Sequence, residues 1–215
     1  MKKVLYGGKA MYDTKTKIWI DIGQKNYEFE TAYYLKYNLE KAYYAIEKIF
    51  SKNINFQEYS NKCVYYHIYI DLLMEAIGQI RSRFNKGTKN KEYNEIRKNN
   101  CKSYDFSKAN FPILYEKEFR NFVTHIDERN IDFILKNKAI GGFNVIFEDT
   151  TEDEKESYLD FKLQNNTLDL VNKIYYIYSN KKNKMINLQL DLLKKELKKL
   201  EEINNSIWSY ITGEY

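Results

Sequence analysis

The sequence predicts a mainly α-helical protein, and three observations carry that prediction. Apolar side chains recur at spacings of three and four over long stretches, which is the pattern of amphipathic helices. Strict alternation of apolar and polar residues, typical of strands, is confined to short segments beside turn-forming residues. The final stretch, 173–215, again has helical spacing between many lysines and glutamates. We therefore expect an antiparallel helical bundle with small antiparallel β-hairpin additions and a long C-terminal helix.

Composition and charge indicate a soluble, globular chain. Its 215 residues suffice for one good core, and 43% of them are hydrophobic and 30% charged. The net charge of +5 favours contact with a polyanion without requiring it. Two cysteines are too few for a disulfide framework, and no residues show metal-ligand spacing, so we expect neither a metal nor a cofactor. No apolar run follows Met1-Lys2-Lys3, and none is long enough to cross a bilayer, so we expect a cytoplasmic protein without a membrane partner.

The pattern divides the chain into four segments of one compact domain. Residues 1–29 are expected to form an N-terminal β-hairpin extension, because 17–22 alternates isoleucines with other residues after a turn. Residues 30–140 are expected to form the helical core. A β-hairpin insertion follows over 141–172, and 173–215 is expected to form a long helix that packs on the core.

Three helices are expected in the core. The first covers 30–50 and the second 58–84, on their apolar stripes. The third starts at Pro112, because proline suits the first helical position, and continues to about residue 137. Between them, 85–109 is polar and lysine-rich, which predicts a surface loop with one helical turn.

The second helix is apolar on more than one side, so it is expected to be central. His67 falls on its apolar stripe and is expected to be a hydrogen-bonded core residue. Gly78 would permit the close approach of a neighbour. Asp71, Glu75 and Gln79 recur every four residues, so they form a polar row that is either a solvated face or the wall of a cleft.

Short strands and a long helix are expected after the core. Strands are predicted over 143–147 and 158–163, and a turn over 164–167 leads to a third strand over 168–171. From 173 to 210 the spacing predicts a helix, either continuous or interrupted near 179–183, whose apolar seam needs a partner helix in this chain or in another copy. That seam consists of Leu193, Leu197, Leu200, Ile203 and Ile207.

The densest group of reactive side chains lies in 111–129, on the third predicted helix. His125 lies about 120° from the centre of the apolar stripe of that helix, so it is not placed as a core residue. Asn121 stands four residues earlier and shares a side of the helix with His125. Arg120 lies about 140° from His125, so one straight helix does not bring the guanidinium and the imidazole together.

These three side chains suit the cleavage of RNA without a metal. The reaction needs a base for the ribose 2′-hydroxyl, an acid for the leaving 5′-oxygen and positive charge on the phosphate. His125 suits the proton transfers because its pKa lies near neutrality. Arg120 suits the phosphate because its planar fork stays charged, and Asn121 can orient the ring or the phosphate.

The run Arg120-Asn121-Phe122-Val123-Thr124-His125 resembles the Arg-polar-x-x-x-His signature of HEPN ribonucleases, which are helical proteins of toxin–antitoxin, abortive-infection and CRISPR-associated systems. The resemblance covers about residues 30–140. It implies a metal-independent endoribonuclease whose RNA products carry 2′,3′-cyclic phosphate and 5′-hydroxyl ends. It also implies a homodimer in which two motifs line one composite cleft, and an antitoxin or another defence protein as a partner.

The resemblance adds further candidate residues. It implies that the second helix walls the cleft, where Glu75 would tune His125. Gln79, Thr124 and Asp127 are further candidates for substrate binding or tuning. Some HEPN toxins carry a tyrosine two residues after the histidine, where a partner nucleotidyltransferase modifies it. This chain has Asp127 at that position and lacks the acceptor of that modification.

Two other interpretations stay open. The charges around Arg120 and after His125 are also typical of a solvated, salt-bridged helix face. The same face and the long last helix could instead bind a protein or RNA without cleavage, as a module of a defence or toxin–antitoxin complex. A solution mass discriminates among these hypotheses, because a strict monomer argues against a composite cleft.

Overall fold

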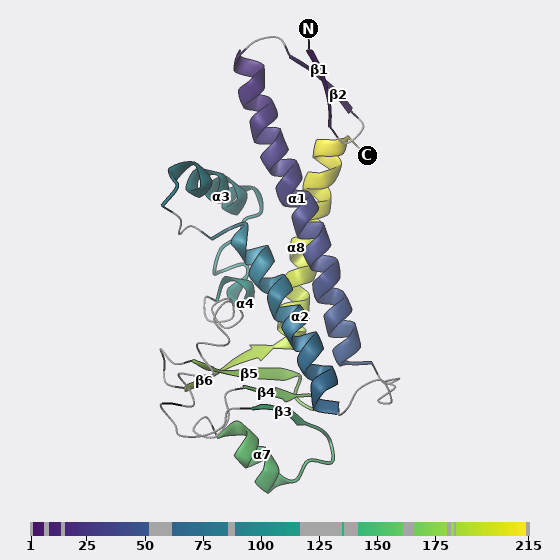
Figure 1. Ribbon diagram of the computed structural model, residues 1–215, viewed down its shortest axis with the longest axis vertical. Helices are drawn as coiled ribbons and strands as arrows, with labels where there is room; N and C mark the ends of the chain where they lie inside the picture. The colour runs from purple at the N-terminus through teal and green to yellow at the C-terminus, as the bar shows by residue number, and fades with distance from the viewer. Residues whose placement is uncertain are drawn as a thin grey trace.

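The computed structural model describes most of the chain, and three long helices form its frame (Figure 1). The described residues are 2–6, 9–13, 16–51, 62–85, 89–116, 135, 142–160, 166–179, 182 and 184–213, with side chains from Tyr27 onward. Helices α1 (Thr16–Ile49) and α8 (Leu190–Thr212) lie side by side along the long axis, and α2 (Lys62–Ser82) packs beside α1. The expected mainly helical fold is thereby confirmed.

The predicted seam of the last helix packs within the chain. Leu193, Leu197 and Leu200 are fully buried, in one core with apolar residues of α1 and α2. Helix α8 ends at Gly213, whose φ of 69° gives the left-handed cap that glycine adopts without strain. None of the described helices combines the length and the apolar character that a bilayer crossing requires.

At the N-terminus the structure contains a hairpin, but it lies earlier than predicted. Strands β1 (Lys2–Tyr6) and β2 (Lys9–Asp13) pair antiparallel. The strand predicted over 17–22 is wrong, since those residues belong to the first turns of α1. Extending an existing helix adds one hydrogen bond per residue fixed, so a long helix can include a short β-branched run. The boundary predicted between residues 29 and 30 therefore falls inside α1.

A four-stranded sheet closes the lower end of the helical frame. Its order is β3 (Phe143–Ile146), β4 (Asn166–Asp169), β5 (Ile174–Ser179) and β6 (Lys184–Gln189). Strand β3 pairs parallel to β4 and the other pairs are antiparallel, so the sheet is mixed where only antiparallel hairpins were predicted.

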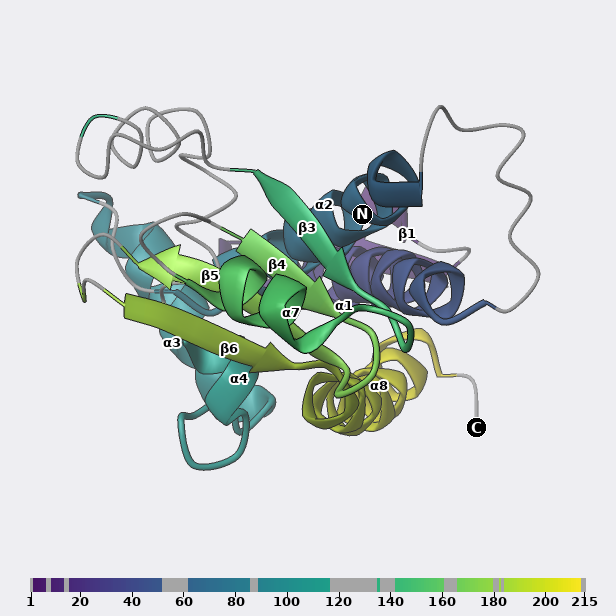
Figure 2. The ribbon, with the colours of Figure 1, turned by 90° about the horizontal axis from the view of Figure 1, so that it is seen from below.

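Helix α7 (Glu152–Leu159) makes the parallel connection between β3 and β4. It covers the outer face of the sheet, while α1, α2 and α8 lie on the other side (Figure 2). Thr151 caps its first turn with a reciprocal Thr151–Glu154 capping box. The strand predicted over 158–163 is therefore wrong at Tyr158 and Leu159, which end this helix.

Two more predicted elements are wrong. The helix expected from residue 173 contains β5 and β6, and only the part from Leu190 is helical. Tyr175 and Ile177 of β5 point into the core, two residues apart, as the two-residue period of a strand requires. The surface loop expected over 85–109 instead contains α3 (Lys91–Ser103), whose first turn is capped by Asn90.

Candidate functional site

The motif residues themselves lie outside the described part of the chain. This holds for Arg120, Asn121, Thr124, His125 and Asp127. The described residues up to Glu116 and those from residue 142 onward show where the chain enters and leaves the motif stretch. Both of these ends pack against helix α2.

Helix α4 (Pro112–Tyr115) leads into the motif stretch, and a buried carboxylate holds its first turn. Pro112 stands at the helix start, as the sequence predicts, but the continuous helix predicted from Pro112 to about residue 137 is wrong, because α4 ends at Tyr115 and the backbone of Glu116 is extended, with a ψ of 120°. The backbone N–H of Ile113 donates to Oε1 of Glu196 at 2.9 Å, and that of Leu114 donates to Oε2 at 2.8 Å. Burial raises the pKa of Glu196, and the two backbone hydrogen bonds and Lys199 partly offset that rise.

The other end of α4 is held by Arg81, which is only 4% exposed. Its Nη1 donates to the backbone carbonyl of Glu116 at 2.5 Å. The Glu116 carboxylate lies 3.8 Å from Nζ of Lys182. The last described residue before the motif is therefore tied by its backbone to α2 and by its side chain to the loop before β6.

The chain returns from the motif stretch at β3, where Phe143 lies on His67. Their rings stack at 4.7 Å with planes 7° apart. Nε2 of His67 lies 3.6 Å from Oδ2 of Asp71, one turn further along α2. Burial raises the pKa of the Asp71 carboxyl, and the His67 charge opposes that rise. The His67 side chain is 42% exposed, so the predicted buried core histidine is wrong.

Both ends of the motif stretch thus contact one face of α2, which we call the anchor face and define by His67, Gly78 and Arg81. His67 and Arg81 are about 21 Å apart along the helix axis but only about 40° apart around it. Gly78 lies between them on the same face. A Cβ built on Gly78 would meet no described atom within 4 Å.

The predicted tuning residues Glu75 and Gln79 lie on a different side of α2. They are about 120° and 160° from Arg81 around the helix, and both side chains are exposed. Glu75 forms an ion pair with Lys41 of α1 at 2.7 Å. The structure therefore brings neither residue to the anchor face, and their role in the site stays a prediction.

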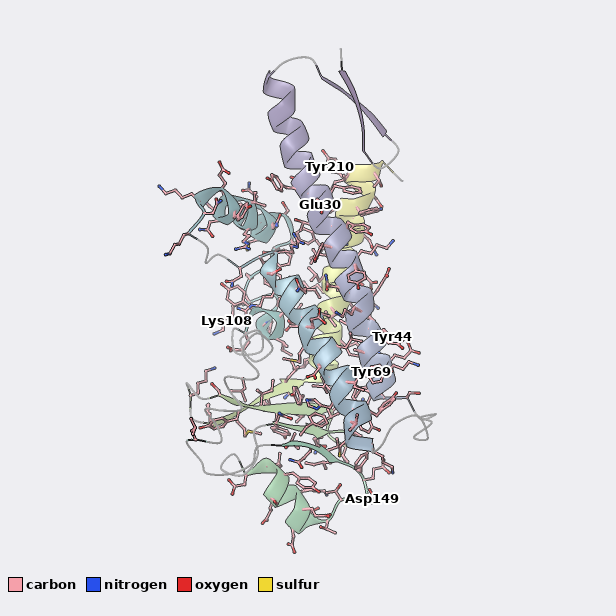
Figure 3. All side chains as sticks on the ribbon, in the orientation of Figure 1. Glu30, Tyr44, Tyr69, Lys108, Asp149 and Tyr210 are labelled. Carbon is pink, nitrogen blue, oxygen red and sulfur yellow. The ribbon has the colours of Figure 1, made fainter. Side chains whose placement is uncertain are left out.

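Two cavities flank the residues that lead into the motif. One has a volume of about 370 Å³ and lies between α4 and β6, with Glu116, Lys182 and Lys184 among its lining residues. The other has a volume of about 340 Å³ and is lined by Arg81, Lys108 and Tyr115 among others. Figure 3 shows Lys108 beside α4. The surroundings of Glu116 therefore carry several cations, which suits an anionic substrate.

Sequence reasoning missed Arg81 and Glu196 as the residues that position α4. Arg81 continues the apolar stripe of α2 that includes Ile70, Met74 and Ile77, and an arginine on such a stripe is a signal of a buried, paired guanidinium. Glu196 stands three residues after Leu193 and four before Leu200, so its spacing gave the same signal, but the prediction grouped it with the lysines and glutamates that cover the other sides of α8. Within the described ranges, no three histidine, cysteine or acidic side chains are grouped as metal ligands.

Comparison with known proteins returned no match of any kind: no family model, no curated protein and no solved structure is similar to the chain.

Proposed function

We propose that the protein is a metal-independent endoribonuclease of the HEPN type, acting in the cytoplasm in phage defence or a toxin–antitoxin system. The observation that carries the proposal is the run Arg120-Asn121-x-x-x-His125. It is supported by the mainly helical fold and by the long helix α2 that precedes the motif. The +5 net charge and the cations around Glu116 also suit RNA.

In the proposed reaction the ribose 2′-oxygen attacks the neighbouring phosphorus as His125 takes its proton. The bond from phosphorus to the 5′-oxygen then breaks, and that oxygen receives a proton. The products are a 2′,3′-cyclic phosphate and a 5′-hydroxyl. Arg120 stabilises the charge on the pentavalent phosphate, and Asn121 orients the ring or the phosphate. Thr124, Asp127, Glu75 and Gln79 are secondary candidates for binding or tuning.

The proposal includes a homodimer, because the wheel geometry separates Arg120 from His125 on one straight helix. A row of tyrosines on α1 supports a protein-contacting surface. Tyr33, Tyr37 and Tyr44 are 57%, 59% and 48% exposed and fall within about 40° of one another around the helix. Tyrosine is enriched in interfaces relative to other surfaces. The same row would serve an antitoxin or defence partner in the alternative, non-catalytic function.

The test is cleavage of a labelled RNA by the purified full chain in the presence of a chelator. His125→Ala should abolish cleavage, and the products of the unchanged chain should carry 2′,3′-cyclic phosphate ends. Glu202→Ala is the control, because Glu202 is exposed on α8 and belongs neither to the motif nor to the anchor face, so this change should leave cleavage intact. No cleavage by the unchanged chain, or equal cleavage by His125→Ala, would refute the proposal. A strictly monomeric mass in solution would refute the composite cleft.

A further inference from the structure

A cavity of about 290 Å³ lies between α1, the end of α2 and α3. Helix α3 contributes side chains at spacings of three and four, which form one face of that helix: Tyr93, Ile96, Arg97 and Asn100. Helix α1 contributes Tyr27, Glu30 and Thr31, and Ser82 and Arg83 stand where α2 ends. Figure 3 shows Glu30 on α1 at the height of α3.

The floor of this cavity is fixed by a buried asparagine. Asn100 is 6% exposed, and its Nδ2 donates to the carbonyl oxygen of Arg83 at 2.9 Å and to Oγ1 of Thr31 at 3.3 Å. These bonds join all three helical elements that surround the cavity. The cavity is therefore formed before any ligand arrives, which limits the conformational entropy that binding costs.

Arg83 is held in position by its contact with an aromatic ring of α1. Its Cζ lies 3.8 Å from the ring centroid of Tyr34, so one face of the guanidinium packs on that ring. Its N–H groups point outward in the guanidinium plane. Nε is buried and has no hydrogen-bond partner among the described residues. Arg83 is also one of the residues that line the cavity, so its positive charge lies beside any ligand bound there.

The charged and aromatic side chains around the cavity indicate a ligand that is larger than a simple inorganic anion. Arg83 and Arg97 supply two positive charges and Glu30 one negative charge, which leaves a net charge of +1 around the cavity. The Glu30 carboxylate opposes a small anion but can accept hydrogen bonds from amino or hydroxyl groups. Tyr27 and Tyr93 are 48% and 51% exposed, so their rings are open to stacking.

We propose that this cavity binds a nucleoside phosphate, with the phosphate on Arg83 and Arg97 and the base against Tyr27 or Tyr93. The volume is at the lower end of the range for small-molecule sites, about 300 Å³ and above, which suits a single nucleotide unit. That unit can be a free nucleotide or an unpaired nucleotide of an RNA strand, since both present the same chemistry. The described residues that line this site belong to α1, α3 and the end of α2, and none of them is a residue of the proposed ribonuclease motif.

The test measures binding by the full-length His125→Ala chain, with adenosine monophosphate and with a 2′-O-methyl hexanucleotide as separate probes. Adding Arg83→Gln or Arg97→Gln should weaken binding about tenfold or more, since each removes a charge-assisted hydrogen bond. Tyr93→Ala should weaken it by a similar factor, while Tyr93→Phe should not. Lys98→Gln is the matched control, because Lys98 adjoins Arg97 but pairs with Glu95 at 3.3 Å.

Binding of the mononucleotide that the arginine variants lose identifies a free nucleotide as the ligand. Binding of the oligonucleotide alone, with the same losses, identifies an RNA strand. The proposal is overturned if neither probe binds at millimolar concentration, or if folded Arg83→Gln and Arg97→Gln chains bind as well as the parent. Thermal melting checks that each variant is folded. RNA cleavage is measured separately with His125 present, so the ribonuclease and this site can fail independently.

Discussion

Replacing Glu196 with alanine should destabilise the fold by about 3 kcal/mol, because that carboxylate holds the first turn of α4. It accepts two backbone hydrogen bonds, at 2.9 and 2.8 Å, from Ile113 and Leu114. A hydrogen bond to a charged group contributes about 1.5–3 kcal/mol, and the two bonds share one carboxylate whose burial is itself costly. Alanine would also leave the N–H of the fully buried Leu114 without its acceptor.

The assay is urea unfolding followed by helical circular dichroism. With a slope of about 2 kcal/mol per molar urea, the midpoint should fall by about 1.5 M. Glu202→Ala is the matched control, because Glu202 is exposed on the same helix and gives the same gain in helix propensity. Its effect should stay within about 0.5 kcal/mol. Equal midpoints for Glu196→Ala and Glu202→Ala would refute the assignment of Glu196 as the residue that holds α4.

Three further predictions concern the same surroundings. Arg81→Met keeps most of the buried stem but loses the hydrogen bond to Glu116, so thermal melting should show a loss of about 1.5–3 kcal/mol; an unchanged melting temperature would contradict it. Gly78→Ala should raise the melting temperature by about 2–4 °C, since alanine gains about 1 kcal/mol in a helix and no described atom obstructs it. A lower melting temperature would reveal a close neighbour on the anchor face. Burial raises the pKa of Glu196 above its usual 4.5, so the folded chain holds that proton more tightly than the unfolded chain. The stability of the parent relative to Glu196→Gln should therefore be greatest below about pH 4.5 and fall as pH rises through the folded pKa, and urea midpoints that diverged with rising pH would contradict this.

Helices with a continuous apolar stripe could be predicted from the sequence. Helix α2 and the Leu193–Leu197–Leu200 seam of α8 follow that stripe, and both are buried as expected. The wrong predictions fall in short segments where the two-residue period of a strand and the 3.6-residue period of a helix both fit the sequence. Residues 17–22 alternate like a strand but continue into α1, and β5 alternates over too few residues to be distinguished from the helical spacing that follows it. Long-range packing decides such segments, and it is absent from a local pattern.

The candidate site also combines features that the local sequence indicates with features that only the fold creates. The motif chemistry rests on residue types and spacing, which are local information, and it stays a prediction. The positioning of α4 could not be predicted, since Glu196 lies more than eighty residues after Ile113 in the chain. The half-exposed state of His67 could not be predicted either, because it depends on the contact with Phe143 on β3. Charged residues acquire such structural roles only when the fold brings distant backbone groups to them.

The anchor face of α2 restricts the positions at which the proposed composite cleft can form. Both described ends of the motif stretch contact α2 on the side of His67 and Arg81, while the exposed row of Asp71, Glu75 and Gln79 turns progressively away from Arg81. If His125 works with α2, the residues nearest to it should belong to the anchor face. Asp71 is about 40° from His67 around the helix, and its Oδ2 lies 3.6 Å from Nε2 of His67. Asp71→Asn should therefore shift the pH dependence of cleavage more than Glu75→Gln, because Glu75 points away from the anchor face and pairs with Lys41 on α1.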